Sequence, residues 1–104
     1  MRMMLVGAGA VGESIVKVMQ WRDPKGMWLE YVLVCDYDKS RAQEVVDKLH
    51  GDARFEAEKV NATDREDMKN LIRTHKIDFV MDAAPPFASN MIFDAAFATG
   101  VNYG

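Results

Sequence analysis

The sequence predicts an α/β fold: a three-layer, doubly wound parallel sheet with helices on both faces. Apolar runs of strand length alternate along the chain with segments whose apolar residues recur at helical spacing. The first apolar run leads directly into a glycine-rich stretch, residues 7–12. Strands separated by helices pair in parallel through right-handed crossovers, so the expected strand order is 3-2-1-4-5, with the fifth strand only begun.

Two strand–helix steps are expected in the first half of the chain. The strands are expected at 2–6 and 29–35, and the helices at 10–22 and from Asp38 or Ser40 to Gly51. The first helix is expected to turn Val11, Ile15, Val18 and Met19 toward the sheet, and the second Ala42, Val45, Val46 and Leu49. A turn over 23–26 separates the two steps.

The second half continues the alternation. We expect a polar edge strand at 53–60, a helix through Met68, Leu71 and Ile72, a strand at 77–82, a helix at 88–99 and a fifth strand beginning at 101–103. Thr63 and Glu66 have the spacing of a capping box, in which the threonine hydroxyl and the glutamate carboxylate satisfy N–H groups at a helix start. Gly100 is expected to end the last helix.

Length and composition limit the classes of protein to consider. A chain of 104 residues is long enough for one domain with a modest core and too short for two. The net charge is −3 and the basic residues are scattered, which disfavours a nucleic-acid partner. No apolar run approaches the roughly 20 residues of a membrane span, and the single cysteine, Cys35, cannot form an internal disulfide. These features predict a cytoplasmic protein.

The stretch Gly7-Ala8-Gly9-Ala10-Val11-Gly12 has the spacing Gly-x-Gly-x-x-Gly. It follows a predicted strand and opens a predicted helix, which is the context that dinucleotide binding requires. Gly7 would permit a tight turn, Gly9 a close approach to a pyrophosphate, and Gly12 close packing of helix on strand. The N–H groups at the helix start would face the phosphates. The alternative is a plain tight turn.

Asp36 follows the second predicted strand, near the roughly 20 residues past the glycines where an acidic residue binds ribose hydroxyls. This favours NAD over NADP, because a carboxylate repels a 2′-phosphate. Lys39 and Arg41 are close enough in sequence to neutralise such a phosphate, and the alternative role of Asp36 is a solvated turn acid. Cys35 is interpreted as an inert core thiol.

No catalytic or metal-binding residue is predicted. His50 and His75 fall at the ends of predicted helices, where the helix dipole favours an imidazolium, and they are interpreted as structural. The sequence contains no cluster of ligands at metal-binding spacing and no nucleophile motif.

Three segments in the last quarter of the chain carry a resemblance to a known family. They are Met-Asp-Ala-Ala-Pro-Pro-Phe at 81–87, Ile-Phe-Asp-Ala-Ala at 92–96 and Gly-Val-Asn-Tyr at 100–103. Together with the segment 60–64 and the glycine motif, they resemble the N-terminal NAD(P)-binding domain of saccharopine dehydrogenase-like proteins, a Rossmann-like domain. The resemblance covers nearly the whole chain.

The resemblance implies a set of cofactor contacts. Gly7, Gly9, Ala10, Val11 and Gly12 would contact the diphosphate, Asp36 the adenosine ribose, Ala62 and Thr63 the adenine, and Ala83, Ala84 and Pro85 the nicotinamide ribose. Tyr37 is also expected to bind the cofactor and stands where NADP-using relatives often have arginine. The chain departs from the family at Asp82, where asparagine is common, and at Asn61, which replaces an aspartate and would accept from the adenine amino group through its amide oxygen.

The family's substrate domain is missing from this chain. Residues 1–104 are therefore interpreted as the dinucleotide-binding part of a longer protein, with an amino-acid or amine substrate bound by another domain. The resemblance implies hydride transfer at a carbon–nitrogen bond; a homodimer is also considered. The alternatives are a nucleotide-sensing regulatory domain and a ligand-free remnant, of which the latter is disfavoured by the three glycines and Asp36. We expect residues 1–104 alone to be inactive.

Overall fold

The computed structural model describes residues 1–104, apart from the side chain of Phe87. Five strands alternate with four α-helices and one 3₁₀ helix. Their bounds are β1 (Arg2–Val6), α1 (Ala10–Arg22), β2 (Tyr31–Asp36), α2 (Lys39–Asp47), β3 (Phe55–Lys59), α3 (Arg65–Thr74), β4 (Phe79–Asp82), the 3₁₀ helix η1 (Pro86–Ala88), α4 (Ser89–Thr99) and β5 (Asn102–Tyr103). The predicted alternation of strands and helices is confirmed.

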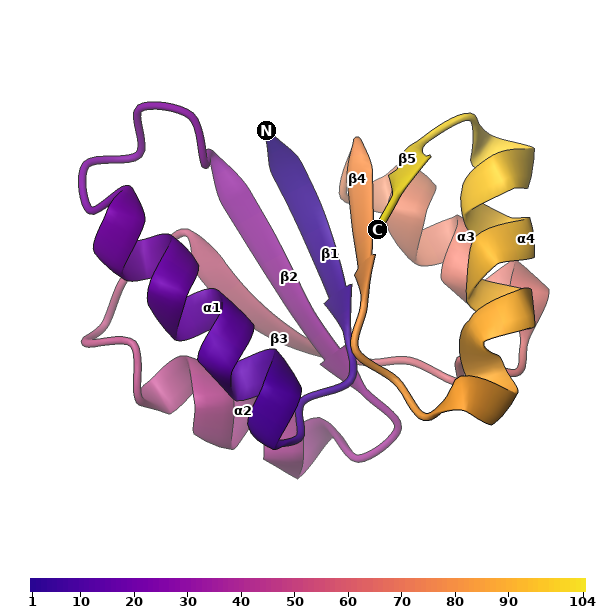
Figure 1. Cartoon of the computed structure of the whole chain (residues 1–104), viewed down its shortest axis with the longest axis horizontal. Helices are drawn as coiled ribbons and strands as arrows, with labels where there is room; N and C mark the ends of the chain where they lie inside the picture. Colours follow the sequence, from indigo (N-terminus) through magenta and orange to yellow (C-terminus); the bar gives the residue numbers. More distant parts are fainter.

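All strands pair in parallel, in the predicted order β3-β2-β1-β4-β5. Helices α1 and α2 cover one face of this sheet and α3 and α4 the other (Figure 1). Because alternate residues of a strand point to opposite faces, β1 and β2 contribute to two separate cores. One core joins Met4, Val6, Leu33 and Cys35 to α3 and α4, and the other joins Met3, Leu5, Val32 and Val34 to α1 and α2.

The predicted apolar face of α1 is partly wrong. Val11 and Val18 are 65% and 51% exposed, whereas Gly12 and Val16 are buried. The helix approaches the sheet at Gly12, where the missing side chain allows the closest contact, and this rotates the buried stripe away from both valines. An apolarity pattern counts valine as core-forming and glycine as neutral, so it cannot find this orientation.

The start of α3 also differs from the capping-box prediction. Asp64 is the N-cap residue, and its Oδ1 accepts hydrogen bonds from the N–H groups of Glu66 and Asp67. The Thr63 hydroxyl instead donates to Oδ1 of Asn61 at 2.6 Å. Aspartate and threonine are both good N-caps, and the carboxylate adds a negative charge that the helix dipole stabilises.

The predicted helix end at Gly51 is too late. Helix α2 ends at Asp47, and His50 and Gly51 lie in the following turn with φ of 60° and 70°. His75 does lie at a helix end, as the C-cap residue of α3, and its ring stacks on Tyr31 with centroids 6.0 Å apart. The first residues predicted as strand at 29–30 and 77–78 precede β2 and β4.

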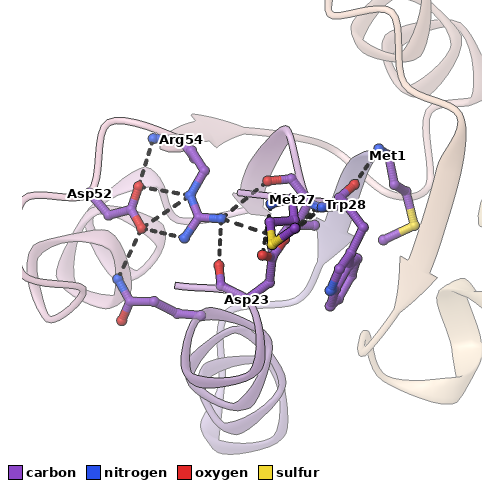
Figure 2. Close-up of polar contacts among 8 residues, drawn as sticks. Met1, Asp23, Met27, Trp28, Asp52 and Arg54 are labelled. Atoms are coloured by element: carbon purple, nitrogen blue, oxygen red, sulfur yellow. Dashed lines mark hydrogen bonds and ion pairs between the residues drawn. The ribbon is translucent and has the colours of Figure 1, made fainter. Parts of the chain in front are cut away.

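The connection between α1 and β2 is held by a buried carboxylate (Figure 2). Asp23 accepts hydrogen bonds from the N–H groups of Met27 at 2.8 Å, Trp28 at 3.0 Å and Leu29 at 2.7 Å. Burial opposes ionisation of this group, but the three N–H donors and the Arg54 guanidinium outweigh it, so the pKa of Asp23 is lowered. This fixed loop positions the beginning of β2, at the opposite end of the sheet from the glycine turn.

Within the described residues, no helix combines the length and the apolar character that crossing a membrane requires.

Candidate functional site

A groove of about 410 Å³ lies at the carboxyl ends of the strands. Its lining comes from the loops after β1, β2, β3 and β4; the residues are Val6, Gly7, Asp36, Tyr37, Arg41, Val60, Asn61, Ala62, Thr63, Ala84, Pro85 and Ala88. These loops meet at the lower end of the sheet in Figure 1. Strand β1 has β2 on one side and β4 on the other, so the winding direction reverses here, and doubly wound sheets bind their ligands at such a point.

Gly7 is required by the packing of the turn that follows β1. Its φ is 107°, and a Cβ atom at this position would lie 2.5 Å from the carbonyl oxygen of Ala83. Its N–H donates to the carbonyl oxygen of Cys35 at 2.8 Å. The first turn is therefore wedged between the ends of β2 and β4, as a tight glycine turn was predicted to be.

Gly12 is required by the packing of α1. A Cβ atom here would lie 1.9 Å from the carbonyl oxygen of Gly7 and 3.3 Å from Cδ2 of Leu5. The predicted close approach of the helix to the strand is confirmed. Gly7 and Gly12 thus both serve the fold, independently of any ligand.

Gly9 differs from the other two glycines because neither its backbone conformation nor its packing requires a glycine. Its φ is −80°, and the nearest atom to a Cβ placed there is Nη2 of Arg41, at 3.6 Å. Gly9 is the N-cap residue of α1 and has no side chain to cap it, whereas the side chains of Asp38 and Asp64 cap α2 and α3. The start of α1 therefore offers open space beside uncapped N–H groups, which is what a phosphate needs for close approach.

Asp36 ends β2 and faces the groove. Its Oδ2 accepts a hydrogen bond from the N–H of Ala8 at 2.8 Å, and its Oδ1 accepts from the N–H of Asp38 at 3.0 Å. The carboxylate therefore fastens the glycine turn to the β2–α2 loop. Each carboxylate oxygen has a further lone pair, so the same group can also accept from a ribose hydroxyl.

The β3–α3 loop forms one wall of the groove. Ala62 and Thr63, the expected adenine contacts, lie there between Asn61 and the start of α3. The prediction for Asn61 needs correction, because its Oδ1 already accepts hydrogen bonds from the N–H and the hydroxyl of Thr63, at 3.1 and 2.6 Å. The amide nitrogen of Asn61 is the group that the structure leaves for a ligand.

The opposite wall follows β4. Ala84 and Pro85 line it, while Ala83 lies behind them and donates its N–H to the carbonyl oxygen of Val6 at 2.8 Å. The small side chains leave the space in front of this wall open. Among the other predicted contacts, Gly9, Ala10, Val11 and Gly12 belong to the neighbouring turn and helix start and do not line the groove itself.

Three apolar lining residues, Val6, Val60 and Ala88, were not predicted as contacts. All three are buried, and no local sequence signal marks them as part of a site. Arg41 also lines the groove and was considered in the sequence only as a partner of a 2′-phosphate. Its position in the first turn of α2, just after the acidic end of β2, is the signal that identifies it.

The ionisable residues that line the groove, Asp36, Tyr37 and Arg41, all come from the end of β2 and the start of α2. In the part of the chain that the structure describes, no group of histidine, cysteine and carboxylate side chains can hold a metal ion. Cys35 is fully buried and its pKa is raised by desolvation, which confirms an inert thiol.

The sheet order, the glycine turn at the reversal point and the acidic end of β2 define a dinucleotide-binding domain of the Rossmann type. Residues 3–104 match the family model described as saccharopine dehydrogenase NADP binding domain. The chain belongs to this family, and it is accordingly an NAD(P)-binding domain. The resemblance seen in the sequence is confirmed.

Two known proteins are similar to this chain, one in sequence and one in fold. The chain is 27% identical over 111 residues to carboxynorspermidine synthase from Vibrio cholerae, covering 99% of this chain and 26% of that protein. Its fold is similar to saccharopine dehydrogenase (L-Glu forming) from Saccharomyces cerevisiae, with a TM-score of 0.77, 16% identity, and coverage of 98% of this chain and 20% of that one. The chain thus spans about a quarter or less of the length of these relatives.

A second structural neighbour is the Bordetella bronchiseptica enzyme WbmG, solved in complex with NAD and UDP. The TM-score is 0.73 at 21% identity, and the match covers 97% of this chain and 35% of that one. At this identity the likeness concerns the fold, and it confirms the Rossmann-like arrangement.

Proposed function

We propose that residues 1–104 are the cofactor-binding part of an oxidoreductase that transfers hydride at a carbon–nitrogen bond of an amino acid or related amine. The observation that carries the proposal is the open groove at the reversal point of the sheet, in a chain that belongs to a saccharopine dehydrogenase family. The groove supports the cofactor-binding part of the proposal. The reaction class rests on the family, whose name refers to a dehydrogenase of an amino-acid derivative.

The site supports a definite placement of the cofactor. The pyrophosphate would lie against Gly9 and the start of α1, where the backbone leaves space and free N–H groups. The adenosine ribose would lie at Asp36, with adenine along the wall at Ala62. The nicotinamide ribose would lie along Ala84 and Pro85, which places the reactive ring near the end of β4.

A substrate must then be supplied from outside this groove. Hydride transfer needs a substrate carbon next to the nicotinamide and an acid or base within reach. The wall at Ala84 and Pro85 provides no ionisable lining residue. A second domain facing this edge of the sheet would hold the amine and complete the cleft. The comparisons do not favour the alternative of a nucleotide-sensing regulatory domain, because the matching family is named for a dehydrogenase.

The first test is a titration of the chain with NADH and NADPH, followed by the fluorescence of the reduced nicotinamide. We expect saturable binding of at least one of the two, and competition by ADP. A chain that is folded by circular dichroism and binds neither dinucleotide would refute the proposed function. The reaction class is tested separately, by assaying the complete gene product for NAD(P)-dependent oxidation of a panel of amino acids and amines.

A further inference from the structure

Asp82 and Tyr103 form a side-chain pair beside the groove, outside its lining. They are the last residues of β4 and β5. The Tyr103 hydroxyl donates a hydrogen bond of 2.6 Å to Oδ2 of Asp82, and the Ala84 N–H donates to Oδ1 at 3.0 Å. A single carboxylate therefore ties β5 to the turn that follows β4.

The tyrosine is held in place from its other side as well. Its ring meets that of Phe93, on α4, edge to face, with centroids 5.4 Å apart. The Asp82 N–H donates to the carbonyl oxygen of Gly104 at 2.9 Å, which adds a backbone link between the same two chain segments. The hydrogen bond to Asp82 raises the pKa of Tyr103, because the neighbouring carboxylate favours the protonated phenol.

The turn that Asp82 holds is the wall of the groove at Ala84 and Pro85. On the side of the glycine turn, the wall is fixed by Ala83, whose carbonyl oxygen would lie 2.5 Å from a Cβ atom on Gly7. On the side of β5, it is fixed by the hydrogen bond from Ala84 to Asp82. Loss of that bond frees one side of the wall while the glycine turn stays in place.

We infer that Asp82 and Tyr103 are positioning residues that set the wall at Ala83, Ala84 and Pro85, and through it the nicotinamide half of the bound cofactor. The inference rests on the proposed function, since it requires a dinucleotide in the groove. Neither side chain lines the groove, so the pair acts through the backbone of Ala84. The adenosine half, which lies at the end of β2, is independent of the pair.

The test compares the affinities of NADH, or NADPH if it binds more tightly, and of ADP, which lacks the nicotinamide half. Tyr103→Phe removes the hydroxyl and keeps the ring contact with Phe93. Asp82→Ala removes both side-chain links. We expect each variant to bind the dinucleotide roughly tenfold more weakly, the equivalent of about 1.4 kcal/mol, and to bind ADP as the wild type does.

A conservative variant separates positioning from a general loss of structure. In Asp82→Asn the amide oxygen can accept from the Ala84 N–H while the amide NH₂ donates to the Tyr103 oxygen, so both links persist. This variant should therefore keep the wild-type ratio of dinucleotide affinity to ADP affinity. Tyr31→Phe is the matched control: it also removes a hydroxyl bonded to a side chain, at 3.1 Å from Nδ1 of His75, but at the start of β2. It should change neither affinity.

Three results would overturn the inference. The first is an unchanged dinucleotide affinity in Tyr103→Phe, and the second is an equal loss of dinucleotide and ADP in that variant. The third is a ratio of dinucleotide affinity to ADP affinity in Asp82→Asn that falls as far as it does in Asp82→Ala. If the wild-type chain binds no dinucleotide at all, the proposed function fails first and this inference fails with it. Tyr103→Phe carries the test should Asp82→Ala not fold.

Discussion

At the scale of single residues, the three glycines of the first turn respond differently to a side chain. Gly9→Ala should leave the free energy of unfolding near that of the wild type, because the new Cβ atom meets nothing closer than 3.6 Å. Gly9→Asp should also fold, but it should abolish dinucleotide binding, since its carboxylate would lie against the pyrophosphate. Urea unfolding and calorimetric titration measure the two effects.

Gly7→Ala is the contrasting variant. Its Cβ atom would lie 2.5 Å from a backbone oxygen, and its φ of 107° disfavours a side chain, so this variant should be destabilised. Unchanged dinucleotide affinity in Gly9→Asp would show that the phosphates bind elsewhere.

Asp36 has two roles that substitution can separate. We expect the wild type to bind NAD more tightly than NADP, because the carboxylate would face the 2′-phosphate. Asp36→Asn should move the preference toward NADP, with Arg41 available beside the phosphate. Asp36→Ala should weaken both cofactors, because it also releases the N–H of Ala8 from the carboxylate. Calorimetry with both cofactors measures the preference, and tighter binding of NADP by the wild type would contradict the prediction.

At the scale of secondary-structure elements, α3 tests the assignment of its cap. Asp64→Ala removes the acceptor for the N–H groups of Glu66 and Asp67, so it should lower the free energy of unfolding by about 1 kcal/mol. Thr63→Ala is the neighbouring control and should cost clearly less, because the hydroxyl bonds to Asn61 and caps no helical N–H. Urea denaturation measures the free energy of unfolding of both variants. A larger loss in Thr63→Ala than in Asp64→Ala would support the capping box expected from the sequence.

The segment between α2 and β3 should confer a dependence of stability on pH. The hydrogen bond from Arg54 lowers the pKa of Asp52 from 3.8 to about 2. The folded state thus holds the ionised carboxylate more tightly than the unfolded chain does. Its contribution is complete above about pH 4 and is lost as the pH falls toward about 2. The full shift corresponds to about 2 kcal/mol, and solvent screening reduces the expected contribution to about 1 kcal/mol.

Asp52→Asn should therefore lose less stability between pH 6 and pH 2.5 than the wild type, as measured by urea midpoints at both values. Asp94→Asn, an exposed position on α4, is the control and should keep the pH dependence of the wild type. An identical pH dependence in Asp52→Asn and the wild type would show that the Arg54 pair has no effect on folding.

At the scale of the whole molecule, we expect residues 1–104 to bind NAD(P) and to turn over no substrate. The ionisable residues of the groove lie at the end of β2 and the start of α2, and an open surface at the end of β4 neither excludes water nor orients an amine. The assay mixes the chain with NAD and a panel of amino acids, including saccharopine and lysine, and follows the absorbance of reduced nicotinamide. Turnover that is lost in Asp82→Asn would reveal a complete active site and an acid–base role for Asp82.

Much of this molecule could be predicted because its signals are local or topological. The alternation of strands and helices, the parallel pairing and the strand order all follow from periodicity and crossover rules. The predictions that were wrong each concerned two residues close together in the sequence, either of which could have filled the same structural role. Asp64 caps α3 in place of Thr63, and Gly12 turns toward the sheet in place of Val11. A difference of one residue changes little in a sequence pattern but decides which side chain meets a partner.

The fold class, the strand order and the turn where the cofactor is expected could be predicted from local patterns, because the glycine motif and its flanking elements are contiguous in the chain. The separate roles of the glycines depend on packing between distant segments. Gly7 is constrained by Ala83, in the turn after β4 and far along the chain, whereas Gly9 faces open space. The contacts of Asp82 with Tyr103 likewise arise only when β4 and β5 pair. Such contacts depend on the positions of whole strands, and no local pattern encodes them.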